Sequence, residues 1–237
     1  LRAAPMAVRD CWSVQMNRML GRSKPCLRRK GRKMDVRQKW DQRYGDTDYE
    51  PSSEPSPFLT EATATLTPGT ALCLAAGDGR NAVWLARASW SVTAVDISAK
   101  GLEWCQRYAR EEGVTINTIE ADLASFDLGH QQWDLITMII FNDPALFPSV
   151  RQSLRPGGHF LFHTFSVGQR RQKWGPSNAA FLARRQDLED GFGDWPWPRF
   201  GDDDYARSDG RIESSLRLLA TNPPNTNPAD TDRPSSN

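Results

Sequence analysis

The sequence predicts an α/β fold in which helices cover both faces of a doubly wound, mostly parallel sheet of seven strands, making three layers. The first observation behind this prediction is the alternation of short apolar runs with longer amphipathic segments between Met34 and Ala220. Such an alternation is typical of βαβ units around a parallel sheet. The second is the segment from Ala71 to Ala82, where an apolar strand runs into a Gly-x-Gly turn and then into a helix. The expected domain spans residues 34–220.

Each element of this sheet follows from a local pattern. The apolar runs predict strands at 70–75, 91–95, 114–119, 133–140, 158–165, 195–200 and 214–220. The amphipathic segments predict helices at 79–88, 98–112 and 144–154. We expect Pro156, Gly157 and Gly158 to end the last of these helices and to turn the chain into the next strand. Because Pro196 and Pro198 cannot donate ladder hydrogen bonds, residues 195–200 are expected at an edge of the sheet.

The composition is ordinary for a soluble globular protein, with 237 residues of which 38% are hydrophobic and 25% charged. The longest apolar runs, such as Leu135 to Phe141, are far shorter than the roughly 20 residues of a membrane helix. No membrane partner is therefore expected. The four cysteines are too few and too scattered for a disulfide scaffold or a metal site; they are Cys11, Cys26, Cys73 and Cys105. We expect a cytoplasmic protein without a bound metal.

The charge is unevenly distributed along the chain. Residues 1–33 hold ten of the 30 Lys and Arg but one of the 29 Asp and Glu, which leaves a net charge of −8 on the rest. An acidic body repels phosphate backbones, so nucleic acid is not an expected partner. The basic stretch is either an RNA-binding or targeting arm, or a non-native extension before a start at Met34. Residues 221–237 lack large apolar side chains and predict a disordered tail.

The Gly-rich turn predicts a binding site for a nucleotide-like ligand. Gly77 and Gly79 let a ligand approach the backbone, and the free amides of the following helix point toward it. Asp96 ends the next strand, 19 residues after Gly77. A carboxylate there can accept both hydroxyls of a ribose. The alternative is that Asp96 only caps the helix that begins after Ile97 and Ser98.

A second carboxylate follows the third predicted strand. Asp122 is placed to accept from the amino group of a base, and Leu123 can pack against its ring. Taken alone, Asp122 is an ordinary loop acid. Its position in series with Asp96 and the Gly-rich turn is what favours a role in binding.

These motifs together resemble the class I S-adenosylmethionine-dependent methyltransferases. The resemblance is carried by Leu72 to Ala86, by Ala94 to Asp96, by Glu120 to Leu123 and by Leu154 to Gly158. Within that superfamily, Trp40-Asp41-x-Arg43-Tyr44, Pro57-Phe58-Leu59 and Gly79 to Ala82 are similar to the tellurite-resistance, TehB-like branch. The match covers roughly residues 38–220, and it implies a Rossmann-like fold and S-adenosylmethionine as the cofactor.

The resemblance also implies a role for individual residues. Ala75, Ala76, Gly77, Gly79, Arg80 and Asn81 would wrap the methionine part of the cofactor. Asp96 would hold the ribose, and Asp122 with Leu123 would hold the adenine. Trp40, Arg43 and Tyr44 match a segment that folds over the cofactor as a lid. Ile97 and Phe141 complete the expected cofactor-binding set.

The sequence departs from its relatives at several positions. Ala75 stands where a glycine is common, so we expect the turn to use an ordinary backbone conformation there. Cys73 stands where an acid is common. The loop after the fourth strand reads Phe141-Asn142-Asp143-Pro144 in place of a Cys-His-Leu-Pro type sequence, and His163 replaces a frequent Glu.

The catalytic residues are not determined by the sequence, and the candidates on the acceptor side are Asn142, Asp143 and His163. Asp143 has an alternative interpretation as the cap of a helix that begins at Pro144. The predicted reaction is in-line transfer of a methyl group to a small-molecule acceptor, such as a chalcogen oxyanion or a thiol. The oligomeric state stays open.

Two other functions are compatible with the same motifs. An NAD(P)-dependent oxidoreductase also needs the turn and Asp96, but no tyrosine of this chain is followed four residues later by the Lys of a Tyr-x-x-x-Lys motif. The other alternative is a cofactor-binding protein without transferase activity. Titration with S-adenosylmethionine and S-adenosylhomocysteine followed by a product assay separates this alternative from an active methyltransferase.

Overall fold

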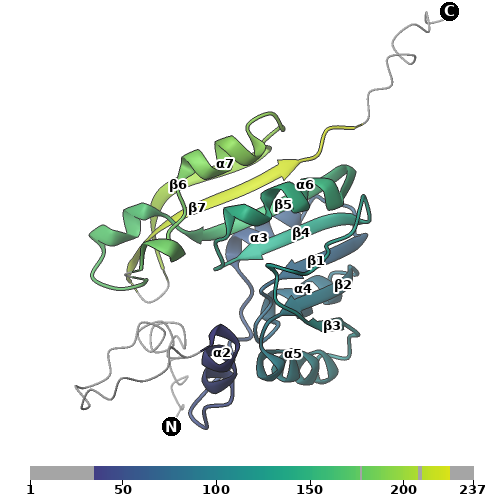
Figure 1. The fold of residues 1–237 in the computed structure, drawn as a ribbon, viewed down its shortest axis with the longest axis vertical. Coiled ribbons are helices and arrows are strands. Elements are labelled where there is room, and N and C mark those ends of the chain that lie inside the picture. Colours follow the sequence, from purple (N-terminus) through teal and green to yellow (C-terminus); the bar gives the residue numbers. More distant parts are fainter. Residues whose placement is uncertain (1–34, 177, 208–209, 225–237) are drawn as a thin grey trace, which may run out of the picture.

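A computed structural model describes residues 35–176, 178–207 and 210–224. Its centre is a seven-stranded sheet in the order β3-β2-β1-β4-β5-β7-β6 (Figure 1). The strands from β3 to β5 are parallel, and β7 is antiparallel to both of its neighbours. This arrangement confirms the doubly wound, mostly parallel sheet that the sequence predicts.

The strands are β1 (Thr70–Leu74), β2 (Ser91–Asp96), β3 (Asn117–Glu120), β4 (Trp133–Ile139), β5 (Leu154–Phe165), β6 (Arg199–Ala206) and β7 (Ile212–Thr221). The α-helices are α2 (Val36–Tyr44), α3 (Pro57–Thr63), α4 (Arg80–Arg87), α5 (Ala99–Glu111), α6 (Phe147–Ser153) and α7 (Arg185–Phe192). The described residues also form three short 3-10 helices, which are η1 (Pro144–Leu146), η2 (Val167–Arg171) and η3 (Ala179–Phe181).

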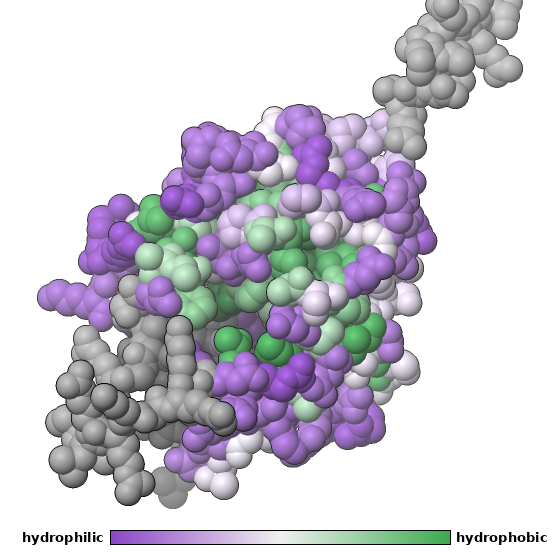
Figure 2. All heavy atoms as spheres, in the orientation of Figure 1, coloured by the Kyte–Doolittle hydropathy of each residue, from purple (hydrophilic) through white to green (hydrophobic). Residues whose placement is uncertain are grey.

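The alternation of side chains along the strands builds two hydrophobic clusters, one on each face of the sheet. In β1, Leu72 and Leu74 belong to one cluster, which α6 and α7 cover with Phe147 and Phe192. Ala71 and Cys73 belong to the other, which is covered by helices α3, α4 and α5. Helices on both faces confirm the three layers. Apolar residues also reach the surface, and Figure 2 shows them as a band across the middle of the face drawn there.

The structure at the start of β5 differs from the predicted helix at 144–154. Residues 144–154 do not form one helix, because η1 and α6 divide the segment and α6 ends at Ser153. Leu154 already pairs with Trp133 and is fully buried, so Pro156 to Gly158 lie inside β5 instead of before it. Gly157 has φ +80° there, and the register of β4 and β5 shifts beside it.

The edge strand of the sheet differs from the prediction of a strand at 195–200. Residues 195–200 do not form the edge strand, because Trp195 is buried against Phe192. The edge strand is β6, which begins at Arg199 and continues through Asp202 to Asp204. An acidic strand is stable at this edge because Arg217 of β7 pairs with Asp203 and Arg171 of η2 pairs with Asp204.

Smaller differences concern the ends of elements. β3 begins at Asn117, not at 114, because the Val114 amide still donates to Ala109 at the end of α5. β7 includes Thr221, which pairs with His159, so the predicted tail starts too early. Residues 225–237 of that tail and the basic segment 1–33 lie outside the described residues. Helices α2, α3 and α7 were not among the predicted helices.

Within the described ranges, no helix combines the length and the apolar character needed to cross a bilayer. The same ranges contain no group of three or more His, Cys, Asp or Glu side chains arranged to hold a metal ion.

Candidate functional site

The turn between β1 and α4 has an unusual backbone. Ala75, Gly77 and Gly79 have φ values of +52°, +58° and +86°. The expectation that Ala75 uses an ordinary conformation is therefore wrong. The turn is held by hydrogen bonds from the Ala76 amide to Val95 O (3.0 Å) and from the Gly79 amide to Ala76 O (3.0 Å). A glycine precedes α4, so no side chain caps the first amides of this helix.

Asp96 lies beside this turn at the end of β2. Its carboxylate accepts from the amide of Gly77 through Oδ2 and from the amide of Ser98 through Oδ1, both at 2.8 Å. Burial raises the pKa of Asp96, and these two hydrogen bonds only partly offset the effect. A carboxylate has about four acceptor sites, so these two hydrogen bonds do not exhaust its capacity to accept. The cap of α5 is Ser98, whose Oγ accepts from the amide of Gly101.

Helix α2 lies over this edge of the sheet. Tyr44 packs against Gly77 so closely that a Cβ at Gly77 would collide with the Tyr44 hydroxyl. Asp41 accepts from the hydroxyl of Ser98 at 2.6 Å, and Trp104 Nε1 donates to Tyr44 O at 2.9 Å. None of the residues of α2 is fully buried. The helix therefore covers the turn without belonging to the core.

Aromatic side chains of α2 and of the segment after it pack together beside Tyr44. Trp40 stacks on Tyr44 with 5.9 Å between centroids, and the guanidinium of Arg43 lies 5.5 to 6.0 Å from the rings of Trp40, Tyr44 and Tyr49. The Tyr49 hydroxyl donates to Asp78 Oδ2 at 2.7 Å, which ties the segment after α2 to the turn. Trp40 and Arg43 thus lie against Tyr44, which covers the turn, and their role as a lid stays a prediction.

The first two residues of α4 contact the chain before α3. Arg80 is buried and donates to Glu54 O at 3.2 Å. Burial, together with the nearby charge of Arg207, lowers the pKa of Arg80 to about 10. Asn81 Oδ1 accepts from the amide of Ser56 at 2.8 Å. Both side chains fasten this segment to the turn.

Asp122 and Leu123 follow the third strand and differ in exposure. Asp122 is exposed, and its Oδ1 accepts from the amide of Ala124 at 3.0 Å. Leu123 is 8% exposed and belongs to the core cluster. The amide of Ala121 donates to Asp96 O at 2.9 Å, so the tips of β2 and β3 lie together. Ile97, beside Asp96, is partly exposed at the same edge.

The loop after β4 holds the acceptor-side candidates. Asn142 Nδ2 donates to Ala180 O at 3.4 Å, and Phe141 packs on the core cluster. Asp143 Oδ1 accepts from the amide of Ala145 at 3.1 Å, which is the capping role considered for it. Ile140, the first residue after β4, has φ +56°. A β-branched residue rarely adopts this conformation.

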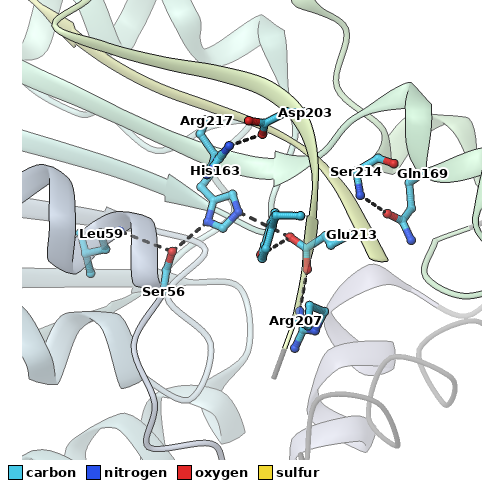
Figure 3. A network of polar contacts seen from close by, with 10 residues as sticks. Ser56, Leu59, His163, Gln169, Asp203, Arg207, Glu213, Ser214 and Arg217 are labelled. Carbon is cyan, nitrogen blue, oxygen red and sulfur yellow. Dashed lines mark hydrogen bonds and ion pairs between the residues drawn. The ribbon is translucent and has the colours of Figure 1, made fainter. Parts of the chain in front are cut away.

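His163 belongs to a buried polar network (Figure 3). Its Nδ1 lies 2.8 Å from Ser56 Oγ, and its Nε2 lies 3.6 Å from Glu213 Oε1. Glu213 is 1% exposed and also accepts from Tyr205 (2.8 Å) and Arg207 (2.6 Å). Burial alone would raise the pKa of Glu213, but His163, Tyr205 and Arg207 hold it below its usual value.

Both ring nitrogens of His163 face protein groups, which makes this side chain a link between β5, β7 and the segment before α3. Sequence reasoning missed Glu213 and Ser56. Glu213 lies on an apolar strand where a single acid is a signal of a buried partner. That signal does not tell which partner it is.

The strand order reverses between β1 and β4, and ligands of open α/β sheets bind outside the carboxyl ends of the strands at such a point. The turn after β1, Asp96 and the loop after β4 meet there.

Residues 71–158, less than half of the chain, match the family model described as a methyltransferase domain. A structure of a SAM-dependent methyltransferase from Methanosarcina mazei matches with a TM-score of 0.59 at 15% identity, over 72% of this chain and 99% of that one. The fold is that of the class I methyltransferases.

Two further solved structures have the class I methyltransferase fold in common with this chain. TehB from Haemophilus influenzae matches with a TM-score of 0.60 at 17% identity, over 78% of this chain and 66% of TehB. A structure from work on the conversion of a disulfide bond into a thioacetal group during echinomycin biosynthesis matches with a TM-score of 0.61 at 18% identity, over 83% and 96% of the two chains. No curated protein sequence matches this chain.

Proposed function

We propose that this protein is an S-adenosylmethionine-dependent methyltransferase that acts on a small acceptor. The observation that carries the proposal is the joining of the Asp96 carboxylate to the amide of Gly77 at the crevice where the strand order reverses. The methyltransferase-domain match over residues 71–158 and the shared fold support it.

The residues at this crevice fit the cofactor. Asp96 is buried, and its carboxylate has acceptor capacity beyond the amides of Gly77 and Ser98 for a ribose hydroxyl. Gly77 and Gly79 expose their backbone, and the uncapped amides at the start of α4 suit the carboxylate of the methionine part. Ile97, and Asp122 after the tip of β3, would contact the adenine. When bound, the cofactor supplies a methyl group that its sulfonium already activates.

Tyr44 now covers Gly77, so we expect α2 to shift when the cofactor enters and to close over it afterwards. The helix has no fully buried residue, which keeps the cost of this movement low. A closed α2 excludes water from the reacting atoms, which is the main requirement of methyl transfer beyond alignment.

The departure at Ala75 does not weaken this proposal. Ala75 adopts the left-handed conformation that a glycine would use, so the turn keeps its shape at the cost of some strain. This observation favours an active cofactor site over a fold that has lost its ligand.

Isothermal titration with S-adenosylmethionine and S-adenosylhomocysteine tests the proposal. Asp96→Ala should raise both dissociation constants by about 10- to 150-fold, equivalent to the roughly 1.5 to 3 kcal/mol of hydrogen bonds to a charged group. Asp190→Ala, which removes a carboxylate on α7 that bonds Gln186, is the matched control and should change neither constant.

Turnover separates the remaining functions. Wild-type protein and labelled S-adenosylmethionine are assayed with small amines, thiols, selenite and tellurite, the last two because of the similarity to TehB. Tight binding without any product would favour a binding protein. Preferential binding of NAD or NADP over S-adenosylmethionine would favour an oxidoreductase.

A further inference from the structure

A line of polar contacts runs from Glu213 of β7 through the ring of His163 to Ser56, as Figure 3 shows. It continues beyond Ser56, whose backbone amide donates to Asn81 Oδ1 at 2.8 Å. Asn81 is the second residue of α4, the helix that directly follows the Gly-rich turn. A buried side chain of β5 is thereby joined to the backbone of the proposed cofactor site.

The contacts of Ser56 indicate where the proton of His163 lies. The Ser56 hydroxyl caps α3, so its oxygen accepts from the amide of Leu59. The hydroxyl proton needs an acceptor of its own, and His163 Nδ1 lies 2.8 Å away. Nδ1 then carries no proton, and the ring proton is on Nε2, which faces the Glu213 carboxylate. An imidazolium would donate from Nδ1 and leave the Ser56 proton without an acceptor among the described residues.

The rest of the network holds this neutral ring in place. Arg207 and Tyr205 donate to Glu213 at 2.6 and 2.8 Å, so the buried carboxylate does not need a cationic histidine to balance its charge. Phe58 of α3 packs edge-on against the ring of His163, with 5.9 Å between centroids. Because the ring cannot turn without breaking these contacts, its Nδ1 offers the hydroxyl before α3 a single position.

Ser56 transmits this fixed position to α4. Because a backbone N–H can only donate, Asn81 Oδ1 must face the Ser56 amide, and the carboxamide has one orientation. The carbonyl of Glu54, two residues before Ser56, accepts from Arg80 at 3.2 Å. The first two side chains of α4 are thus both bound to residues 54–56. The helix begins after Gly79 without a side-chain cap, so these two bonds hold its first turn.

We propose that His163 is a positioning residue for cofactor binding, which fixes the first turn of α4 through Ser56 and Asn81. This proposal rests on the proposed function and gives His163 a role through other residues, in place of contact with the acceptor. A first turn that is already ordered binds the carboxylate of the cofactor without an ordering cost. Loss of one hydrogen bond from the line should raise the dissociation constant about 3- to 10-fold.

Titration with S-adenosylhomocysteine measures the effect in two variants. Ser56→Ala removes the hydroxyl but keeps the backbone amide that donates to Asn81. His163→Phe keeps a ring beside Phe58 and removes both ring nitrogens. Each variant should raise the dissociation constant about 3- to 10-fold. If His163→Phe does not fold, Ser56→Ala carries the test, because it removes a single oxygen atom.

Each variant has a matched control. Thr63→Val removes another buried hydroxyl of α3, which donates to Leu59 O at 2.7 Å, and it controls for a weakened helix. His159→Phe removes a second histidine of β5, whose Nδ1 lies 3.0 Å from the Thr221 hydroxyl. Neither residue belongs to the line. Both controls should change the dissociation constant by less than about twofold.

A double-mutant cycle separates positioning from a general loss of stability. In Asn81→Ala the connection to α4 is already broken, so the further change Ser56→Ala or His163→Phe should alter the dissociation constant by less than about twofold. Effects that multiply instead would show that the line does not act through Asn81, and they would overturn the proposal.

Nitrogen NMR of the cofactor-free protein tests the line without any ligand. The chain has 3 histidines, so the ring resonances that disappear in His163→Phe are readily assigned. We expect a proton on Nε2 and none on Nδ1 at neutral pH. A proton on Nδ1 would reverse the bond to Ser56 and contradict the proposal.

Failure of this proposal differs from failure of the proposed function. If wild-type protein binds S-adenosylhomocysteine and Ser56→Ala binds it equally well, His163 does not position the site, while the proposed function stands. If wild-type protein does not bind S-adenosylhomocysteine at all, the proposed function is wrong, and this proposal is wrong with it.

Discussion

Ala75 and Ile140 occupy equivalent positions at the two sides of one crevice. Each is the first residue after a strand, Ala75 after β1 and Ile140 after β4, and these strands are neighbours in the sheet. Both have left-handed backbones, with φ values of +52° and +56°. Non-glycine residues in this conformation store strain that the surrounding structure has to hold, and such strain concentrates at functional sites.

The strain at Ala75 predicts opposite effects of glycine at two adjacent positions. Ala75→Gly relieves a left-handed alanine, so the free energy of unfolding should stay level or rise by up to about 1 kcal/mol. Ala76 does not share the positive φ, and Ala76→Gly should lower stability by about 0.5 to 1 kcal/mol through the added freedom of the unfolded chain. Urea unfolding of both variants provides the comparison. Equal losses would show that Ala75 carries no strain.

The contact between Tyr44 and Gly77 predicts a partial rescue. Gly77→Ala places a methyl group against the Tyr44 hydroxyl and forces a left-handed alanine, so it should weaken cofactor binding at least about tenfold. Tyr44→Phe removes the hydroxyl, and Gly77→Ala combined with Tyr44→Phe should bind more tightly than Gly77→Ala alone. Titration with S-adenosylhomocysteine measures this. Additive losses in the double variant would mean that the two residues do not meet in the bound state.

The buried carboxylate of Asp96 predicts a pH dependence of stability in the cofactor-free protein. Burial raises the pKa of Asp96, so its contribution favours folding at acidic pH and is lost as the pH rises through the folded-state pKa. From acidic to neutral pH, Asp96→Asn should therefore gain stability relative to the wild type, whatever its constant offset from altered hydrogen bonds. Chemical denaturation across this range, with Asp190→Asn as the control, measures the slope. Parallel curves for Asp96→Asn and wild type would contradict the prediction.

The buried network around Glu213 predicts the opposite dependence. The pKa of Glu213 is held below its usual value, so its contribution is present above the unfolded-state pKa and is lost as the pH falls through the folded-state pKa. Glu213→Gln leaves Arg207 and His163 without their carboxylate and should cost about 3 kcal/mol at neutral pH, and less in acid.

An exposed pair provides the control for Glu213. Glu189 bonds Arg185 at 2.7 Å on the surface of α7, and Glu189→Gln should change the free energy of unfolding by less than about 0.5 kcal/mol. A comparable loss in both variants, or a pH-independent loss in Glu213→Gln, would mean that the network does not stabilise the protein through its charge.

Short-range patterns predicted much of the fold. The alternation of apolar runs specified β1, β2 and β4 closely, and the spacing between Gly77 and Asp96 placed a carboxylate beside the turn, as the hydrogen bond between them shows. Such local signals failed at β6, because the predicted edge strand ended at residue 200 and left out Asp202 to Asp204. Those acids form a strand because Arg217 and Arg171, from other elements, pair with them.

The sequence by itself determined strands β1, β2 and β4, helices α4 and α5, the Gly-rich turn and the carboxylate at the end of β2, because these depend on residues close together in the chain. Tertiary structure alone decided that Ala75 and Ile140 are left-handed and that His163 faces Glu213 across 50 residues. Backbone strain and polar pairing at these places arise from contacts between strands that only the folded sheet brings together.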